Sequence, residues 1–208
     1  MALIIHHLEN SRSQRVLWLL EELGAGYDVK RYERDRKTML APPELKLVHP
    51  LGKSPIVEDG DTIVAETGAI IDYLVEKAAG RLSPPKGSQA ALRYRFFLHY
   101  GEGSLMPWLL VMLVIRRLGL LGRPARPIVQ AMLDQHLDFL ENELSDREWF
   151  AGDEFTAADV MMSFPLETAR HRAGLDESRP RLIRWLDRIH SRPAYHAALA
   201  RGGPYAYA

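Results

Sequence analysis

The pattern of apolar and polar positions separates the chain into two parts with different elements. In the first 80 residues, short β-branched or alternating runs are typical of strands, and runs with apolar residues at every third or fourth position are typical of helices. These runs predict strands at 3–8 and 27–32, a hairpin at 56–64, and helices over 16–23, 41–48 and 65–80. The order of these elements predicts one sheet with a parallel pair and a hairpin, covered by helices.

Residues 81–88 are polar and contain two prolines, as is typical of a linker between domains. No strand pattern follows them. Helical patterns cover 90–118, 128–144, the stretch after Thr156, 181–190 and 193–199. Gly101, Gly103 and Pro107 predict a bend in the first of these helices. The sequence therefore predicts an α/β domain at 1–80, a linker at 81–88 and an all-helical domain at 89–208.

Composition and charge restrict the function of the chain. Its 208 residues include 27 basic and 27 acidic side chains, so bulk charge does not favour nucleic acid or an anionic membrane as a partner. There are no cysteines, which excludes a protein thiol, and the histidines show no metal-like spacing. No signal-peptide pattern is present, and the apolar run Leu105–Ile115 is too short to span a membrane. We expect a soluble, cytoplasmic protein without a metal.

The junction between the first strand and the first helix is the main candidate site. Asn10, Ser11 and Ser13 lie in the stretch Leu8-Glu-Asn-Ser-Arg-Ser-Gln-Arg15, where a strand ends and a helix begins. Backbone N–H groups and the positive end of a helix dipole meet at such a junction and favour an anion. The alternative is that Asn10 or Ser11 is an ordinary helix N-cap.

Four separated motifs give the chain a resemblance to the cytosolic glutathione S-transferases, nearest to a bacterial and fungal subgroup. They lie in the family's order and spacing: Asn-Ser-Arg-Ser-Gln-Arg15, His49-Pro-Leu-Gly-Lys-Ser-Pro55, Glu66-Thr67 and Phe155-Thr-Ala-Ala-Asp159. The last is also a helix capping box, with Thr156 at the N-cap and Asp159 in its N3 position. The resemblance covers essentially the full length. It implies a thioredoxin-like βαβαββα domain, an all-helical second domain and glutathione as co-substrate.

The resemblance also implies which residues bind glutathione. Pro55 is expected to follow a cis peptide bond, with the backbone of Ser54 pairing with the cysteinyl part of the ligand. Glu66 would receive the ammonium group, and Thr67 at a helix start would receive the γ-glutamyl carboxylate. Lys53 would reach the glycyl carboxylate. The alternatives are a turn proline, a plain helix cap and a solvated surface charge.

By its position four residues before Arg15, Ser11 corresponds to the catalytic serine of serine-type members. Lowering a thiol pKa from about 8.5 by about two units requires about 2.7 kcal/mol. A charge-assisted hydrogen bond supplies roughly 1.5–3 kcal/mol, and a helix end roughly 0.3–1 more. One hydroxyl at a helix end is therefore sufficient. Ser13, Asn10, a backbone N–H or a residue of the second domain remain alternatives. Residues His6-His7 replace the tyrosine of tyrosine-type members.

The resemblance implies conjugation of glutathione to small hydrophobic electrophiles, with peroxide reduction as a further activity, in a homodimer. An electrophile pocket is expected between the domains, and its candidate walls are Leu8, Tyr100, Met106, Trp108 and Met112. The alternative is that these side chains belong to the core or to a dimer contact. A glutathione-dependent isomerase or dehalogenase, or a non-catalytic protein-interaction module of the same fold, remain the alternative functions.

Overall fold

A computed structural model describes residues 3–208 and divides the chain into two compact units. The first unit extends from the N-terminal strand to Leu82 and also includes His190–Ala206, whereas the second extends from Ser83 to Ile189. From the sequence, residues 89–208 are expected to form one helical domain. The structure instead groups the C-terminal helix with the first unit.

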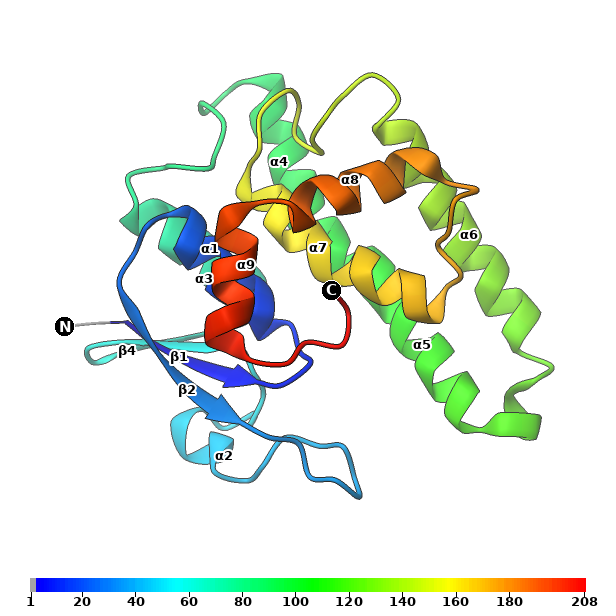
Figure 1. Cartoon of the computed structure of the whole chain (residues 1–208), viewed down its shortest axis with the longest axis horizontal. Helices are drawn as coiled ribbons and strands as arrows, with labels where there is room; N and C mark the ends of the chain where they lie inside the picture. The colour runs from blue at the N-terminus through cyan, green and yellow to red at the C-terminus, as the bar shows by residue number, and fades with distance from the viewer. Residues whose placement is uncertain (1–2) are drawn as a thin grey trace. The chain divides into compact units, whose positions relative to one another are not determined.

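The first unit contains a four-stranded mixed sheet with the order β2-β1-β3-β4 (Figure 1). Its strands are β1 Leu3–Leu8, β2 Tyr27–Tyr32, β3 Ile56–Asp59 and β4 Thr62–Ala65. β1 pairs with β2 in parallel and with β3 in antiparallel register, and β3 and β4 form the hairpin. This confirms the predicted parallel pair and hairpin.

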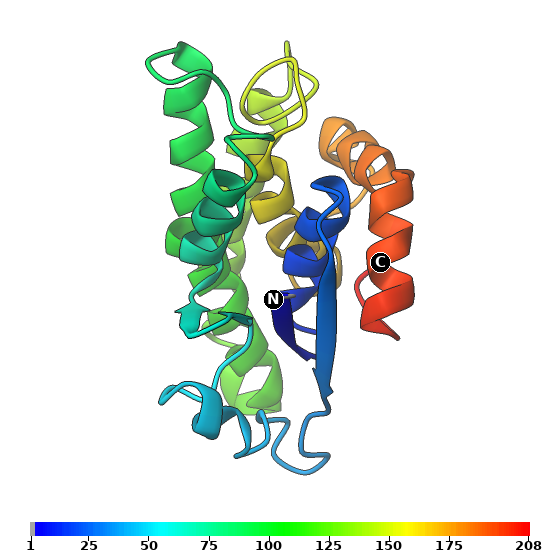
Figure 2. The same cartoon turned by 90° about the vertical axis from the view of Figure 1, so that its left-hand side faces the viewer.

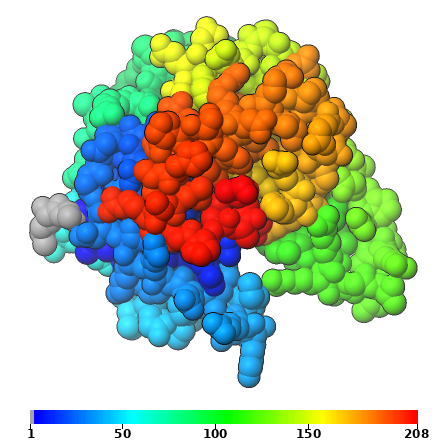
Figure 3. Space-filling view, in the orientation of Figure 1, coloured from blue at the N-terminus to red at the C-terminus, as the bar shows by residue number. Residues whose placement is uncertain are grey.

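Two helices of the first unit pack against a central one, α1. The helices of this unit are α1 Ser13–Glu22, α2 Leu45–Val48, α3 Thr67–Lys77 and α9 Pro193–Gly202. α1 contacts β1, α3 and α9, and Figures 1 and 2 show α9 beside α1. In the space-filling view, the orange-red atoms of α9 lie against the blue atoms of the N-terminal residues (Figure 3). As a result, every residue from Ser13 to Leu20 is buried, although the apolar pattern of α1 indicates only one buried face.

The second unit is helical, as the sequence predicts. Its elements are α4 Gln89–Tyr100, a π-helical turn η1 Gly101–Leu105, α5 Met106–Arg117, a 3-10 turn η2 Gly119–Gly122, α6 Arg126–Glu143, α7 Ala157–Arg172 and α8 Pro180–His190. The π turn lies where a bend is expected. A Cβ at Gly101 would press on Met161 of α7, so a glycine allows the two helices to approach closely.

The capping box of α7 is present. The Thr156 hydroxyl oxygen accepts a bond from the Ala158 N–H, and the Asp159 carboxylate accepts one from the Thr156 N–H. The stretch Gln89–Arg117 satisfies a length and composition test for a membrane span. A partly buried core helix of a soluble protein passes the same test, so the match is weak evidence for a membrane.

Candidate active site

The turn between β1 and α1 places two serine hydroxyl groups inside the first unit. Asn10 has a left-handed backbone, with a φ of 48°, which asparagine tolerates better than most residues. Arg12 holds the N-cap position of α1 without a side-chain capping bond. Ser11 Oγ accepts a bond from the Ser13 N–H at 3.2 Å. Ser11 thus caps a first-turn N–H of α1, as the alternative of an ordinary helix cap describes, whereas the Asn10 side chain accepts from the Ala206 N–H instead.

The two hydroxyl groups belong to a buried chain of hydrogen bonds that ends on a histidine. Ser11 Oγ lies 2.8 Å from Ser13 Oγ, and Ser13 Oγ lies 2.9 Å from His7 Nδ1. The three residues are 5%, 0% and 2% exposed, respectively. Buried hydrogen bonds of this kind polarise one another, so a change at His7 reaches Ser11 through Ser13.

His7 is neutral at pH 7. Its pKa is lowered to about 4, mainly by burial and further by the positive charge of Arg31, while a hydrogen bond to the backbone of Gly202 opposes both effects. A neutral imidazole has one donor and one acceptor nitrogen. Because Nδ1 faces Ser13, the nitrogen that donates to the backbone of Gly202 is Nε2. Nδ1 therefore accepts from the Ser13 hydroxyl, and in the absence of a ligand Ser13 Oγ accepts from the Ser11 hydroxyl.

The same end of β1 also holds the loop that precedes β3. The N–H of Leu8 points at both Ser13 Oγ and Ser54 Oγ, at 3.2 Å each. Ser54 Oγ donates to the His6 carbonyl at 2.8 Å. The Ser54–Pro55 peptide bond is cis, as the resemblance implies. Within residues 3–208, the backbone N–H and C=O of Ser54 form no hydrogen bond. The structure thus brings Ser11, Ser13 and Ser54 together at the end of β1.

The start of α3 carries a strained residue. Glu66 occupies its N-cap position with a φ of 70° and a ψ of 125°, a conformation that costs a non-glycine residue roughly 1–3 kcal/mol. Its side chain is exposed and forms no capping bond, while Thr67 beside it is buried. Strained backbone of this kind is concentrated at ligand sites, so the conformation of Glu66 indicates a binding role for this residue.

The other predicted ligand residues are not joined to the hydroxyl chain. Lys53 is exposed on the loop before Ser54. In the described part of the chain, Lys53, Glu66 and Thr67 form no hydrogen bond with Ser11 or Ser13. The same region, residues 3–208, has no cluster of three histidine or carboxylate side chains that would hold a metal ion.

The candidate electrophile walls are mostly buried. Leu8 is 4% exposed in the first unit, and Tyr100, Met106 and Met112 are at most 8% exposed in the second. Tyr100 contacts His136 Nδ1 through its hydroxyl at 2.6 Å, and its ring lies against that of Phe139. Trp108 is half-buried. The contacts of Tyr100 agree with the alternative that it belongs to the core.

Sequence reasoning missed His7 as part of the site. The residue was noted only for what it replaces, the tyrosine of other members. The signal was present: a polar residue in a strand buried on both faces needs a partner, and Ser13 follows in the first turn of the next helix. His6 has separate partners, Tyr32 and Glu58, at 2.8 Å each.

Comparisons with known proteins match most of the chain. The profile of the glutathione S-transferase N-terminal domain matches residues 4–76, and that of the C-terminal domain matches residues 121–188. Glutathione S-transferase 3 of Schizosaccharomyces pombe is 35% identical over 94% of this chain and 86% of its own length. Glutathione S-transferase 1 of Saccharomyces cerevisiae is 34% identical over 93% and 92%, respectively. A crystal structure of a glutathione S-transferase from Actinobacillus pleuropneumoniae is 33% identical, with a TM-score of 0.89 over 99% of this chain and 95% of that one.

Proposed function

Because the chain belongs to the glutathione S-transferase family, we propose that it conjugates glutathione to small hydrophobic electrophiles after stabilising the thiol as a thiolate. Family membership makes it a glutathione transferase with glutathione as its co-substrate. The mechanism proposed here depends on one observation, the buried chain His7–Ser13–Ser11 at the end of β1.

The backbone of Ser54 supports the binding of the middle of the tripeptide. Its N–H and C=O lie next to the first residue of β3 and have no partner within residues 3–208. An extended ligand adds to such a position as a short strand. This pairing would direct the cysteinyl side chain toward Ser11, because Leu8 bonds to both Ser54 and Ser13.

The ends of the tripeptide need one negative and two positive sites. In the proposal, the exposed carboxylate of Glu66 binds the ammonium group. The first N–H groups of α3 and the Thr67 hydroxyl bind the γ-glutamyl carboxylate, since α3 has no side-chain cap. Lys53 pairs with the glycyl carboxylate as a point charge. The strained backbone of Glu66 supports this arrangement, because a simple helix start does not need it.

Ser11 stabilises the thiolate in this mechanism. The ligand sulfur accepts a hydrogen bond from the Ser11 hydroxyl, and Ser11 Oγ accepts from the Ser13 N–H. The Ser13 hydroxyl donates to Nδ1 of His7, because the N–H of the neutral imidazole is taken by the backbone of Gly202. The Ser13 N–H and the Ser11 O–H then both point toward the negative sulfur, which strengthens each bond. Ser13 and His7 act through Ser11 and are positioning residues. The thiolate attacks the electrophile, forms the carbon–sulfur bond and expels the leaving group with its electron pair. Attack on a hydroperoxide oxygen by the same thiolate would break the O–O bond and give an alcohol and the sulfenic acid of glutathione, which a second glutathione would convert into the disulfide and water.

A calorimetric titration with glutathione, with the thiolate followed by its ultraviolet absorbance, tests this proposal. In Ser11→Ala we expect the pKa of bound glutathione to rise by about one to two units, while affinity changes by less than about fivefold. Ser13→Ala keeps the backbone N–H that donates to Ser11 Oγ and should change this pKa by less than Ser11→Ala does. Ser145→Ala, at an exposed serine, is the matched control and should leave both quantities unchanged.

The outcomes of this titration distinguish between the proposed mechanism and its alternatives. Thiolate retained in Ser11→Ala would remove Ser11 from the mechanism and leave Asn10 or a backbone N–H as the donor. No glutathione binding by the wild type would favour a non-catalytic interaction module. Turnover of an activated aryl chloride, with an isomerisation or dehalogenation substrate and a hydroperoxide assayed in parallel, separates the transferase from its alternatives.

The proposal also includes a homodimer that acts in the cytoplasm. Leu92 and Phe96, one helical turn apart on α4, are 54% and 46% exposed. Exposed apolar pairs of this size are common at subunit interfaces. Sedimentation velocity would give about twice the monomer mass if the proposal is correct and the monomer mass if it is wrong.

A further inference from the structure

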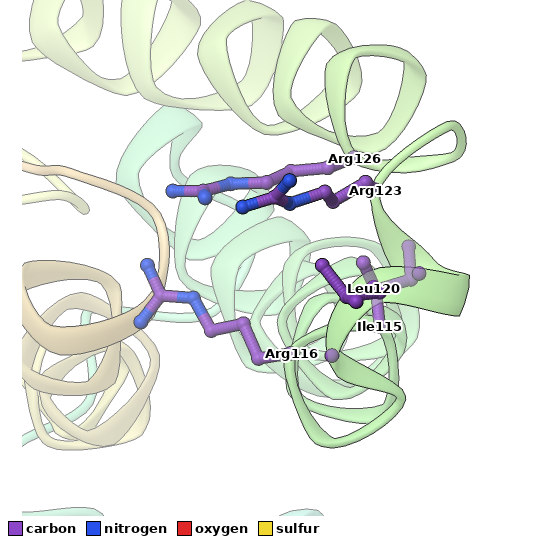
Figure 4. Close-up of a pocket in the computed structure, with 7 residues that line it drawn as sticks. Ile115, Arg116, Leu120, Arg123 and Arg126 are labelled. Atoms are coloured by element: carbon purple, nitrogen blue, oxygen red, sulfur yellow. The ribbon is translucent and has the colours of Figure 1, made fainter.

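A cavity lies wholly within the helical unit, where α5 ends and α6 begins. Its volume is about 350 Å³, and it is lined by Ile115, Arg116, Gly119, Leu120, Gly122, Arg123 and Arg126 (Figure 4). Neither the glutathione-binding proposal nor the electrophile wall uses any of these residues. The volume is at the lower end of the range for pockets that bind small organic molecules.

Two glycines build the turn that forms this pocket. Gly119 has a φ of 57°, which ends α5 in the left-handed conformation that favours glycine. Gly122 is buried against the end of α5, and a Cβ there would collide with the carbonyl oxygen of Ile115. The chain therefore folds back tightly over the last turn of α5. Arg123 and Arg126 on the returning segment come to lie across from Arg116.

The pocket carries three positive charges that are not balanced by carboxylates. Arg116, Arg123 and Arg126 form no ion pair within residues 3–208, and no acidic side chain lines the cavity. Arg116 is held by one bond, from Nη1 to the His171 carbonyl at 2.6 Å, which leaves its other N–H groups for a ligand. Figure 4 shows the side chains of Arg123 and Arg126 extending side by side in the same direction, with Arg116 across the gap.

Other arginines of the same unit, unlike those of the pocket, are paired with carboxylates. Arg179 bonds to both Asp134 and Asp138, and Arg181 bonds to Glu141. Like charges that converge without a counter-charge repel one another, so the arginines of the pocket gain more than these paired ones from an added anion. Planar guanidinium groups also match the oxygen geometry of phosphate and carboxylate.

Two apolar side chains also line the pocket. Ile115 is buried at the end of α5, and Leu120 is 72% exposed on η2. A leucine at such exposure beside three arginines provides an apolar contact next to the charged one. A ligand that fits both would carry an anionic group at one end and a hydrocarbon or aromatic part at the other.

We propose that this cavity binds a small organic phosphate, with the phosphate between Arg116 and the pair Arg123 and Arg126 and the apolar part on Ile115 and Leu120. A phosphate monoester carries nearly two negative charges at neutral pH and three acceptor oxygens, which suits three guanidinium groups better than a single carboxylate does. The site does not depend on the glutathione mechanism, because it shares no residue with it.

Titration calorimetry of the full-length protein with phenyl phosphate tests the site. Loss of two charge-assisted contacts in the double variant Arg123→Gln/Arg126→Gln should weaken binding by at least about tenfold. The matched control Arg117→Gln changes an adjacent exposed arginine outside the lining and should alter binding by less than about twofold. Thermal unfolding of each variant shows that the fold is kept.

Three further titrations separate the parts of the proposal. Inorganic phosphate should bind more weakly than phenyl phosphate, and Leu120→Ala should reduce the affinity for phenyl phosphate while leaving that for inorganic phosphate unchanged. Saturating glutathione should not displace phenyl phosphate. Absence of binding at millimolar ligand, equal binding by the double variant, equal affinity for inorganic phosphate, or displacement by glutathione would each overturn the assignment.

Discussion

His7 links the stability of the first unit to pH at the scale of a single residue. Its pKa is about 4 in the folded protein, because burial disfavours the charged imidazole, and about 6.5 in the unfolded chain. Below pH 6.5 the unfolded chain therefore binds a proton that the folded protein does not bind. The contribution of His7 to stability is lost as pH falls, by about 2 kcal/mol between pH 7.5 and pH 5.

We expect His7→Gln to remove this part of the pH dependence. Denaturant unfolding of wild type and variant at pH 7.5 and pH 5 gives the free energies, and the wild type should lose about 2 kcal/mol more than the variant over that interval. His99→Gln, at an exposed position on α4, is the control and should follow the wild type. Parallel curves for wild type and His7→Gln would show that His7 is not held neutral by the fold.

Glu66 offers a test in which stability and ligand binding change in opposite directions. Its φ of 70° is strained for glutamate and easily adopted by glycine. Glu66→Gly should therefore raise the free energy of unfolding by up to about 1 kcal/mol, after the added chain entropy of glycine is subtracted. The same substitution removes the proposed partner of the ligand ammonium, so glutathione affinity should fall by at least about tenfold.

Glu66→Ala separates the two effects. Alanine removes the carboxylate but keeps the strained backbone, so affinity should fall as in Glu66→Gly while stability does not rise. Calorimetric titration and denaturant unfolding of both variants give the two quantities. If Glu66→Gly kept the affinity of the wild type, the ammonium site would have to lie elsewhere.

At the scale of an element, Asp159 connects the start of α7 to its neighbours. Its carboxylate accepts bonds from the Phe150 N–H, the Trp185 Nε1–H, and both the N–H and the hydroxyl of Thr156. Burial raises its pKa to about 6 in spite of these donors. Both carboxylate oxygens accept hydrogen bonds. An asparagine amide therefore cannot replace the carboxylate without placing its NH₂ group against a donor.

Asp159→Asn should thus lower the free energy of unfolding by about 2–4 kcal/mol, since at least one buried donor loses its acceptor. Denaturant unfolding at pH 7.5 measures the change. Asp153→Asn, exposed in the preceding loop, is the control and should cost less than about 0.5 kcal/mol. A change in Asp159→Asn as small as that of the control would mean that the four donors have other acceptors.

The elements that the sequence predicted best are those whose signals are local. β1 and β2 have the predicted bounds, because β-branched and alternating runs mark half-buried or buried strands directly. The hairpin lies where Asp59-Gly60 predicts it. The second helix is shorter than predicted and begins at Leu45, after a turn that contains the two prolines, and Leu47 within it is 88% exposed. Leu45 is buried, so only one of the two leucines of this helix packs against the unit, which the apolar residues alone did not show.

The candidate site was predictable only in part. Ser11, Ser13 and Ser54 were identified from the strand–helix junction and the proline loop. The bond from Ser13 to His7 was not, because it depends on the backbone path of the turn at Asn10. The arginine pocket was also missed, since its three side chains converge only after the glycine turn at 119–122.

At the scale of the whole molecule, the C-terminal helix completes the unit that the N-terminus begins. A helical pattern shows that α9 has an apolar face but not which element that face covers. In the structure Tyr195 is 2% exposed, and its ring meets Trp18 of α1 edge to face at 5.3 Å. Arg192, just before α9, forms two bonds to Glu22 at the end of α1, at 2.5 and 2.8 Å.

This arrangement predicts that a destabilising substitution in α9 lowers the local stability of α1, near the other end of the sequence. Tyr195→Ala removes a buried ring against α1 and should cost about 3–5 kcal/mol of stability, as for other large aromatic residues. Because α1 needs α9 to bury its second face, amide hydrogens of α1 should exchange faster with solvent in this variant. His196→Ala, exposed on the same helix, is the control and should leave exchange in α1 unchanged. If protection in α1 survived the loss of Tyr195, α1 would be held by the sheet and α3 alone, and the first unit would be complete by Leu82. If protection in α1 is lost, the stability of α1 depends on its contact with α9.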